Sequence, residues 1–353
     1  MVRFTVLASG SRGNGTIITG GRTRILVDAG LSCRELFRRM RLAGENPESL
    51  DAILVTHEHQ DHVGGLAVTA RKLGIPVYFT EATHRAWMRW LAPRRQMTYA
   101  QWLEQCRLQA AERQAEAVGA DMEGEADDPE PNGECAAGQT MSAAPAVPAT
   151  PTRPATEAAP AIHESLESPK LESEESPSPG PKDDPTWLPA VEYFEAGRNF
   201  SIGDLEVASF TTPHDAADPV GFVFASEGIR MGYATDLGYI SPNVKACLQN
   251  LDLLLLEANH DLEMLRDGPY PWMVKQRVLS RVGHLSNDAT AEFLTQDYDG
   301  RAAWIILAHL SENNNLPELA RVAAERALSR CPSLLLNRLL IAGQHQPLSP
   351  VDF

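Results

Sequence analysis

The sequence predicts an α/β fold in which two β-sheets are covered by helices, with a disordered acidic insertion in the middle of the chain. Short β-rich runs occur in both halves, and stretches with helical periodicity lie between them. The middle of the chain is instead rich in Pro, Ala, Ser and Glu. With 353 residues, 43% of them hydrophobic, the chain is long enough for one large domain or two ordinary ones.

The N-terminal part begins with two predicted strands, "RFTVLAS" (3–9) and "TRILVDAG" (23–30), which we expect the Gly-rich turn "GSRGNG" (10–15) to join. Two more strands are expected in "ILVTH" (53–57) and "IPVYFT" (75–80). Between these lies "GLAVTARKLG" (65–74), whose pattern is helical.

The insertion is predicted over residues 98–186, which divides one folded domain into residues 1–97 and 187–353. A helix is expected over about 98–119, followed by a disordered run over about 120–186 that has almost no aromatic or β-branched content. The net charge of the chain is −16, but residues 121–184 contain 15 acidic and 3 basic residues. The folded part is therefore only mildly acidic, and the net charge does not exclude a nucleic-acid substrate.

The C-terminal part continues the alternation of strands and helices. Strands are predicted in "LEVASFTTPH" (205–214), "VGFVFAS" (220–226), "RMGYATDLG" (230–238), "DLLLLEAN" (252–259) and "AAWIILAHLS" (302–311). One helix, "SNDATAEFLTQ" (286–296), has Ser286 or Asn287 as its expected N-cap. Another, "LPELARVAAERALSR" (316–330), opens with a proline near its first turn.

Metal-ligand side chains follow four of these predicted strands. They are His57, His59, Asp61 and His62 in "THEHQDHVGG", then His214, Asp236 and His309. Imidazole nitrogen and carboxylate oxygen are ligands that borderline divalent metals prefer. In an extended segment His57 and His59 point the same way and suit one ion, whereas Asp61 and His62 can turn to a second. Asp236 can bridge two such ions, although an aspartate after a strand is often only a helix cap.

The same chain lacks features of exported or membrane proteins. No apolar run reaches the roughly 18 residues that a membrane span needs, and the N-terminus has no signal-peptide pattern. The five cysteines are scattered and form no CxxC pair, so we expect reduced thiols. A cytoplasmic location without membrane association is the expectation.

The motifs resemble those of the metallo-β-lactamase superfamily, and more narrowly its WalJ (YycJ) type. The matching segments are "LASGSRGNGT", "ILVDAGLS", "LVTHEHQDHVGGL", "FTTPHDAADPVGFVF", "GYATDLGYI", "LLLEANHDLEML", "GPYP", "GHLSN" and "LAHLSENNN". They cover nearly all of residues 1–97 and 187–325, and the insertion departs from the pattern. The resemblance implies a four-layered αβ/βα sandwich with a dinuclear zinc or manganese site.

The resemblance also implies roles for individual residues. One ion would be held by His57, His59 and His214, the other by Asp61, His62 and His309, with Asp236 as the bridge. Asp28 would orient a ligand histidine, unless it is a plain turn aspartate. A turn near the site is expected from Ser9, Gly10, Ser11, Gly13 and Asn14.

His260 and His284 compete with His309 for the last ligand position, because each also follows an apolar or small residue. The order of motifs, which is similar to that of tRNase Z, favours His309. His284 then takes a catalytic place, where it could protonate a leaving oxygen, and Glu257 could hold its loop.

The resemblance implies a phosphodiester hydrolase, and more narrowly a 5′-to-3′ DNA exonuclease, with Asp61, His284 and Glu257 in catalytic roles. Basic residues that could follow a nucleic-acid backbone are Arg12, Arg34, Arg38, Arg39, Arg41, Arg85, Arg89, Arg94 and Arg95. RNA, or a small phosphodiester, thioester or lactone in a closed apolar pocket, is the alternative substrate. A non-catalytic protein that binds partners through its acidic insertion is disfavoured, because every ligand position is filled.

Overall fold

The computed structural model describes residues 1–91, Arg107, 184–330 and 337–353. Met1–Ala92 and Pro179–Phe353 form one compact unit. The helix expected over 98–119, apart from Arg107, and nearly all of the run expected to be disordered lie outside the described residues, so the limits of the insertion stay a prediction. The described chain resumes at Asp184, where Arg71 donates hydrogen bonds to the carbonyls of Asp184 and Pro185.

The first sheet has seven strands in the order β14-β1-β2-β3-β4-β5-β6. Their bounds are β1 Arg3–Ala8, β2 Gly15–Gly20, β3 Thr23–Val27, β4 Ala52–Leu54, β5 Val77–Phe79, β6 Val191–Tyr193 and β14 Val351–Asp352. The pairs from β14 to β3 are antiparallel, and those from β3 to β6 are parallel. Since Val77 on β5 pairs with Val191 on β6, the chain re-enters the same sheet after the insertion.

The second sheet also has seven strands, in the order β13-β12-β11-β10-β9-β8-β7. Their bounds are β7 Asn199–Ile202, β8 Leu205–Thr211, β9 Val220–Ser226, β10 Ile229–Ala234, β11 Leu253–Glu257, β12 Trp304–Ala308 and β13 Arg338–Ile341. The pairs from β10 to β13 are parallel, whereas β7, β8, β9 and β10 pair in antiparallel fashion. Strands β8, β10, β11 and β12 therefore run in one direction and end at the same edge.

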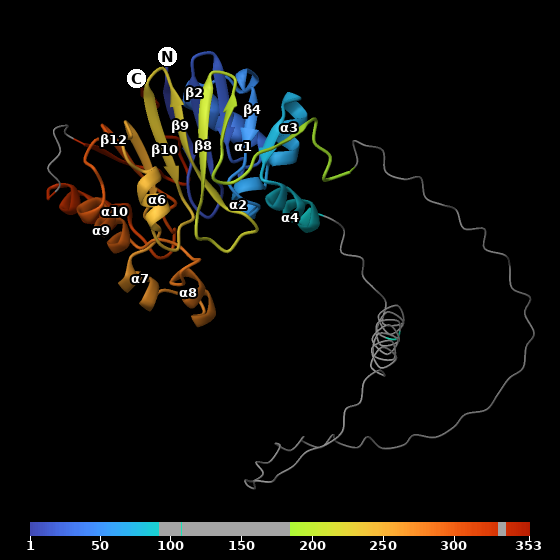
Figure 1. Ribbon diagram of the computed structural model, residues 1–353. Coiled ribbons are helices and arrows are strands. Elements are labelled where there is room, and N and C mark those ends of the chain that lie inside the picture. The colour runs from blue at the N-terminus through green and yellow to red at the C-terminus, as the bar shows by residue number, and fades with distance from the viewer. Residues whose placement is uncertain (92–106, 108–183, 331–336) are drawn as a thin grey trace, which may run out of the picture. The chain divides into compact units, whose positions relative to one another are not determined.

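Helices cover the outer face of each sheet (Figure 1). Their bounds are α1 Cys33–Leu42, α2 Gln60–Val63, α3 Leu66–Leu73, α4 Glu81–Leu91, α6 Pro242–Cys247, α7 Leu262–Asp267, α8 Trp272–Val278, α9 Asn287–Gln296 and α10 Pro317–Leu328, with a 3₁₀ turn at Pro47–Ser49. Figure 1 shows α1 and α3 beside the first sheet, α6, α9 and α10 beside the second, and α7 and α8 beyond the strand ends.

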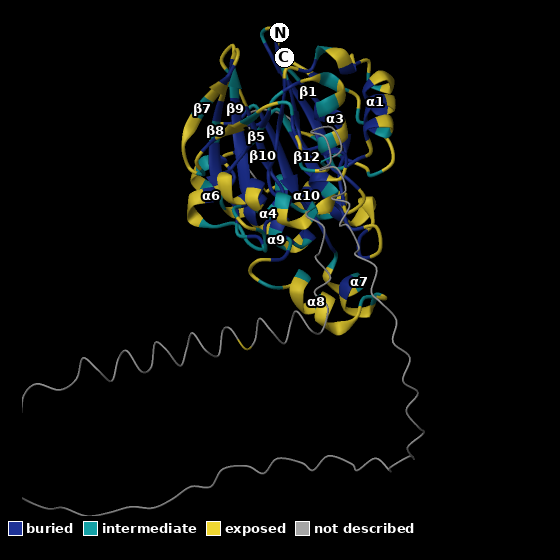
Figure 2. Cartoon of the chain, turned by 90° about the vertical axis from the view of Figure 1, so that its right-hand side faces the viewer, coloured by how far each residue is buried: buried dark blue, intermediate teal, exposed yellow. Residues whose placement is uncertain are grey.

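Three apolar clusters hold these layers together. The central one joins the two sheets face to face, and it contains Phe4 and Ile18 of the first sheet and Phe222 and Leu255 of the second. The other two join each sheet to its own helices. Figure 2 shows the buried sheets between helices whose outer faces are exposed. The predicted four-layered sandwich is confirmed. Each sheet is covered by helices on one face and by the other sheet on the opposite face, so its strands are buried on both faces.

One predicted connection is wrong. The expected turn over residues 10–15 does not join β1 directly to β3, because "GTIITG" forms the intervening strand β2. Its β-branched Thr and Ile side chains suit a buried strand, and all six of its residues are buried. The expected helix start at Ser286 is confirmed, since Ser286 Oγ accepts the backbone N–H of Ala289. No described helix is long and apolar enough to cross a membrane.

Candidate functional site

The site lies at the edge where the parallel strands of both sheets end. Asp28 follows β3, Asp236 follows β10 and His309 follows β12. All three have left-handed backbones, with φ of 60°, 59° and 56°. Such a conformation costs free energy in a residue with a side chain, and it recurs where a site needs a particular direction. Here it turns each side chain out of its strand and into the site.

Three histidines from two sheets form the first group that could hold a metal ion, which we call the imidazole triad: His57, His59 and His214. His57 Nε2 lies 3.1 Å from His59 Nδ1, which lies 3.3 Å from His214 Nε2. His57 and His214 are buried, and His59 is partly exposed. Three imidazole nitrogens that converge in this way can occupy three corners of one coordination sphere.

A second group, which we call the carboxylate triad, consists of Asp61, His62 and His309. His309 Nε2 lies 3.4 Å from Asp61 Oδ2, and His62 Nε2 lies 3.5 Å from the same oxygen. Asp61 and His62 lie on the single turn of α2 directly after the imidazole pair, so the change from strand end to helix directs them to this second position.

Asp236 lies between the two triads. Its Oδ2 is 3.4 Å from His62 Nε2, while its Oδ1 is 3.5 Å from His309 Nε2 and 3.8 Å from His214 Nε2. It caps no helix, because Ser241 is the N-cap of α6. Its Oδ2 is buried and has no hydrogen-bond partner. A buried carboxylate oxygen without a donor is costly unless a cation is bound there.

Asp28 is fully buried behind His62. Its Oδ2 lies 2.8 Å from His62 Nδ1, and its Oδ1 accepts the backbone N–H of Thr56 at 2.9 Å. The Thr56 hydroxyl reaches Asp28 and also lies 3.0 Å from His57 Nδ1. The contact of Asp28 with His62 Nδ1 directs His62 Nε2 to the site, as a carboxylate behind a metal-binding histidine does. Thr56 was missed in the sequence, where it resembles any strand-end threonine.

The glycine-rich turn after β1 also contacts the site, as expected. Ser9 Oγ accepts the backbone N–H of His309 at 2.8 Å, and Asn14 Nδ2 donates to Asp61 Oδ2 at 3.2 Å. Gly30 is required beside this turn, because an added Cβ would lie 1.6 Å from the carbonyl oxygen of Asp61. The backbone of α2 is therefore held against two loops of the first sheet.

His284 and Glu257 form a pair at the rim of the carboxylate triad. His284 Nδ1 lies 2.7 Å from Glu257 Oε1, and the other Glu257 oxygen accepts the backbone N–H groups of Leu237 and Leu285. Glu257 Oε1 also lies 3.2 Å from His309 Nδ1. Glu257 is completely buried, whereas the His284 side chain is 22% exposed. With Nδ1 held by Glu257, Nε2 is the nitrogen of His284 that remains for a ligand.

Among the three histidines that compete in the sequence, His260 lies outside every ligand group found in the described residues. Both of its ring nitrogens are buried without a hydrogen-bond partner. Burial lowers its pKa to about 4, which keeps the ring neutral near pH 7.

The pKa values of the buried histidines shift in opposite directions in the two triads. Burial lowers the pKa of His57 and His214. Burial acts in the same direction on His62 and His309, but the Asp236 carboxylate and its neighbours outweigh it and raise both pKa values. Histidine-bound protons thus balance the buried carboxylates in the metal-free protein, and a divalent cation could take that role.

A cavity of about 330 Å³ opens onto this site. Its lining residues are Ser11, His59, Gln60, Asp61, Asp215, Asp236, Val274, Arg277, Val278, Gly283, His284 and His309. Arg277 of α8 is ion-paired with Asp215 across the cavity mouth. Neither was singled out in the sequence; the signal for Arg277 was the run of residues 272–281, which has three basic and no acidic side chains.

Some residues expected to contact substrate serve the fold instead. Arg39 is buried and donates to the carbonyls of Leu7 and Gln344, so it cannot follow a nucleic-acid backbone. Arg12 is paired with Glu312, and Arg94 and Arg95 lie outside the described residues.

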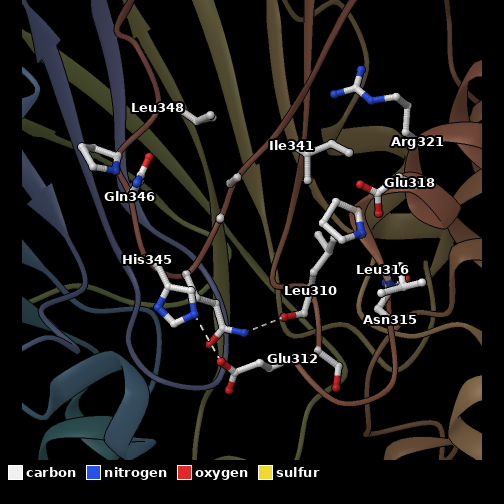
Figure 3. A pocket seen from close by; sticks show the side chains of 16 residues that line it. Leu310, Glu312, Asn315, Leu316, Glu318, Arg321, Ile341, His345, Gln346 and Leu348 are labelled. Atoms are coloured by element: carbon white, nitrogen blue, oxygen red, sulfur yellow. Dashed lines mark hydrogen bonds and ion pairs between the residues drawn. The ribbon is translucent and has the colours of Figure 1, made fainter.

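A larger cavity of about 660 Å³ lies beside the site, between α10 and the segment that follows β13. Figure 3 shows Leu310, Leu316 and Ile341 in its wall, with His345 next to Glu312. Its lining contains none of the residues of either triad.

Comparisons with known proteins identify the family. The Metallo-beta-lactamase superfamily model matches residues 9–133, and the Beta-lactamase superfamily domain model matches residues 149–309. Exodeoxyribonuclease YycJ of Bacillus anthracis is 30% identical over 327 residues, which are 93% of this chain and 89% of that protein. Exodeoxyribonuclease WalJ of Streptococcus pneumoniae (strain D39) is 29% identical over 328 residues, 93% of this chain and 88% of that protein.

Solved structures show the same fold at low identity. The metallo-beta-lactamase fold protein YhfI from Bacillus subtilis superposes with a TM-score of 0.55 at 13% identity, over 98% of each chain. From the sandwich, the converging ligand groups and 30% identity across nearly the whole of a relative, we conclude that this chain belongs to the metallo-beta-lactamase superfamily and is a hydrolase of the WalJ (YycJ) type.

Proposed function

We propose that the protein is a metal-dependent exonuclease that hydrolyses DNA from the 5′ end. The observation that carries this proposal is the pair of ligand triads on either side of Asp236, at the base of a cavity that also contains His284. The relatives that match 93% of the chain are named exodeoxyribonucleases, which supports DNA as the substrate class.

The donor set fits two divalent cations, zinc or manganese. The imidazole triad would hold one ion, the carboxylate triad the other, and Asp236 would bridge them. When bound, the ions would polarise the scissile phosphate and supply a nucleophile from water at neutral pH.

Within this site, His284 is placed to give a proton to the leaving oxygen. Water adds to phosphorus and gives up one proton to solvent, the P–O3′ bond breaks, and the O3′ of the released nucleotide takes the proton from His284 Nε2. The contact of Glu257 Oε1 with Nδ1 fixes the orientation of the ring. Asp61 would contribute its carboxylate to the second ion, beside His62 and His309.

The lining of the cavity favours a phosphodiester over an apolar substrate. Histidines and carboxylates dominate it, and Arg277 supplies a cation at the mouth, so it is not the closed apolar pocket that a lactone or thioester would favour. The three carboxylates in the lining also mean that the wall alone is not the positive groove expected for nucleic acid. Bound cations would provide the missing positive charge.

The test is hydrolysis of end-labelled, 5′-phosphorylated single-stranded DNA, with added manganese or zinc. We expect stepwise shortening from the 5′ end by the wild type and none by Asp61→Ala. Parallel reactions with labelled RNA and with a small phosphodiester separate the substrate classes. Rapid hydrolysis of the small ester with no cleavage of either nucleic acid would overturn the proposal.

A further inference from the structure

A second hollow, of about 290 Å³, adjoins the active-site cavity. It is lined by Glu58, His59, Gln60, Ala86, Arg89 and Trp90. His59 and Gln60 line both spaces, so the hollow lies directly next to the metal-binding cavity on this side. Figure 1 shows the two helices that form it, α2 and α4, next to each other at the edge of the first sheet.

Trp90 is the feature of this hollow that the fold does not explain. Helix α4 packs on the sheet through Thr83, His84 and Trp87, which are buried. Trp90 lies one turn after Trp87 and remains 53% exposed. A large aromatic ring that adds little to the core, beside a catalytic cavity, offers a flat surface on which another ring can stack.

The polar groups of the hollow are only partly satisfied. Glu58 Oε1 accepts the backbone N–H of Ala217 at 2.8 Å, but its Oε2 is buried without a hydrogen-bond partner. Arg89 forms no ion pair with any carboxylate in the described part of the chain. The hollow therefore offers an aromatic face, an acceptor for an N–H group and a cation for an anion. A nucleotide provides the matching base face, base N–H edge and phosphate.

The chemistry of the proposed reaction decides which nucleotide this is. His284 lies on the α8 side of the cavity, so the leaving O3′ and the nucleotide that carries it belong on that side. The retained strand is attached to the same phosphorus through its O5′ and has to leave by another route. The hollow across His59 and Gln60 provides that route.

We propose that this hollow binds the first nucleotide of the retained single strand, with its base stacked on Trp90 and its following phosphate at Arg89. This inference rests on the proposed phosphodiesterase function and adds a substrate-binding site to it. Base–aromatic stacking tolerates every base, so the site would guide a strand through the enzyme without selecting a sequence.

Two chromogenic esters test the site without the need for DNA cleavage. In thymidine 5′-(p-nitrophenyl phosphate) the retained group is a nucleoside, whereas in methyl p-nitrophenyl phosphate it is a methyl group. With metal-loaded wild type we expect kcat/KM to be about tenfold higher for the nucleoside ester, as one base stack provides. Trp90→Ala should abolish this preference and leave the methyl ester unaffected, while Trp90→Phe should restore most of it.

Trp272→Ala is the matched control, since Trp272 is 68% exposed on α8 and lines neither space. It should keep the nucleoside preference. On 5′-phosphorylated DNA, replacing the second nucleotide with an abasic one should slow the wild type about tenfold. The same replacement should have no effect on Trp90→Ala. If wild type prefers the nucleoside ester through Trp90 but cuts no DNA, the exonuclease proposal fails and the binding site stands. Equal preference in wild type and Trp90→Ala, or loss of it in Trp272→Ala alone, would overturn the site.

Discussion

The two ligand triads are built from similar residues in different surroundings. The imidazole triad contains three histidines and no carboxylate of its own, and His214 is held from behind by a backbone carbonyl, that of Gly283 at 3.0 Å. The carboxylate triad includes Asp61, and its histidines are contacted from behind by the buried side chains of Asp28 and Glu257. The imidazole triad thus presents neutral nitrogen atoms, while the carboxylate triad is surrounded by negative charge.

This difference predicts different preferences for metal. Neutral imidazole nitrogens suit zinc, whereas added carboxylate oxygens also suit harder ions such as manganese. Carboxylates behind ligand histidines make the imidazoles more basic and fix their orientation. The affinity of the carboxylate triad for its ion should therefore depend on the negative charge in and behind it, while the affinity of the imidazole triad should depend on its three nitrogens alone.

The largest effect is expected from removing one ligand of each triad. His59→Ala should lose the ion of the imidazole triad and keep the other, whereas Asp61→Ala should do the reverse. Both should abolish turnover, because the two ions act on one phosphate. Elemental analysis after gel filtration measures the occupancy, which should fall from about two ions to about one per chain. Loss of both ions in each variant would show that the triads are a single cooperative site.

A smaller effect is expected at the boundary of the carboxylate triad. His284→Ala should keep both ions and lower turnover roughly 10²–10⁴-fold, as expected for lost acid catalysis. His309→Ala should instead lower occupancy of the second ion. Metal analysis of the two variants, alongside their rates, separates a ligand from a proton donor. Metal loss in His284→Ala with retention in His309→Ala would reverse the two roles.

The third prediction concerns the charge behind the ligands. Asp28→Asn keeps the shape of the side chain but removes the negative charge that faces His62 Nδ1. We expect the affinity for the second ion to fall by about 10- to 100-fold, with the first ion unchanged. Competition with a metal-sensitive dye measures both affinities. An equal loss at both triads would show that Asp28 acts on the loop as a whole, through Thr56.

Much of this site could be predicted because its ligands occur in one short segment and at strand ends. Four of the seven ligand candidates lie within residues 57–62, and the other three follow predicted strands. The order of strands in each sheet was not predictable in the same way, because the pairing of β5 with β6 joins segments on either side of the insertion.

Most of the errors and omissions arise from contacts between segments that lie far apart in the sequence. An arginine on a helix is usually exposed, yet Arg39 contacts two carbonyls that belong to segments far away in the sequence. Trp90 and Arg277 are recognisable only when their helices are placed next to the loops of the site. Contacts between distant segments decide the cases of Arg39, Trp90 and Arg277. Strand β2 was overlooked for a local reason, since a glycine-rich turn directly precedes it.

The mildest test uses the metal-free protein, where the two triads should respond to pH in opposite directions. The raised pKa values of His62 and His309 mean that their contribution to stability is complete below about 6.5, the unfolded value, and is lost as the pH rises through the folded pKa. The lowered pKa values of His57 and His214 mean that stability is lost as the pH falls below about 6.5, because the unfolded chain then binds more protons. Urea unfolding of chelator-treated protein between about pH 5 and 9 should give a maximum between these limits. In His309→Gln the alkaline decline should weaken and the acidic one persist; an unchanged alkaline decline would show that other groups cause it.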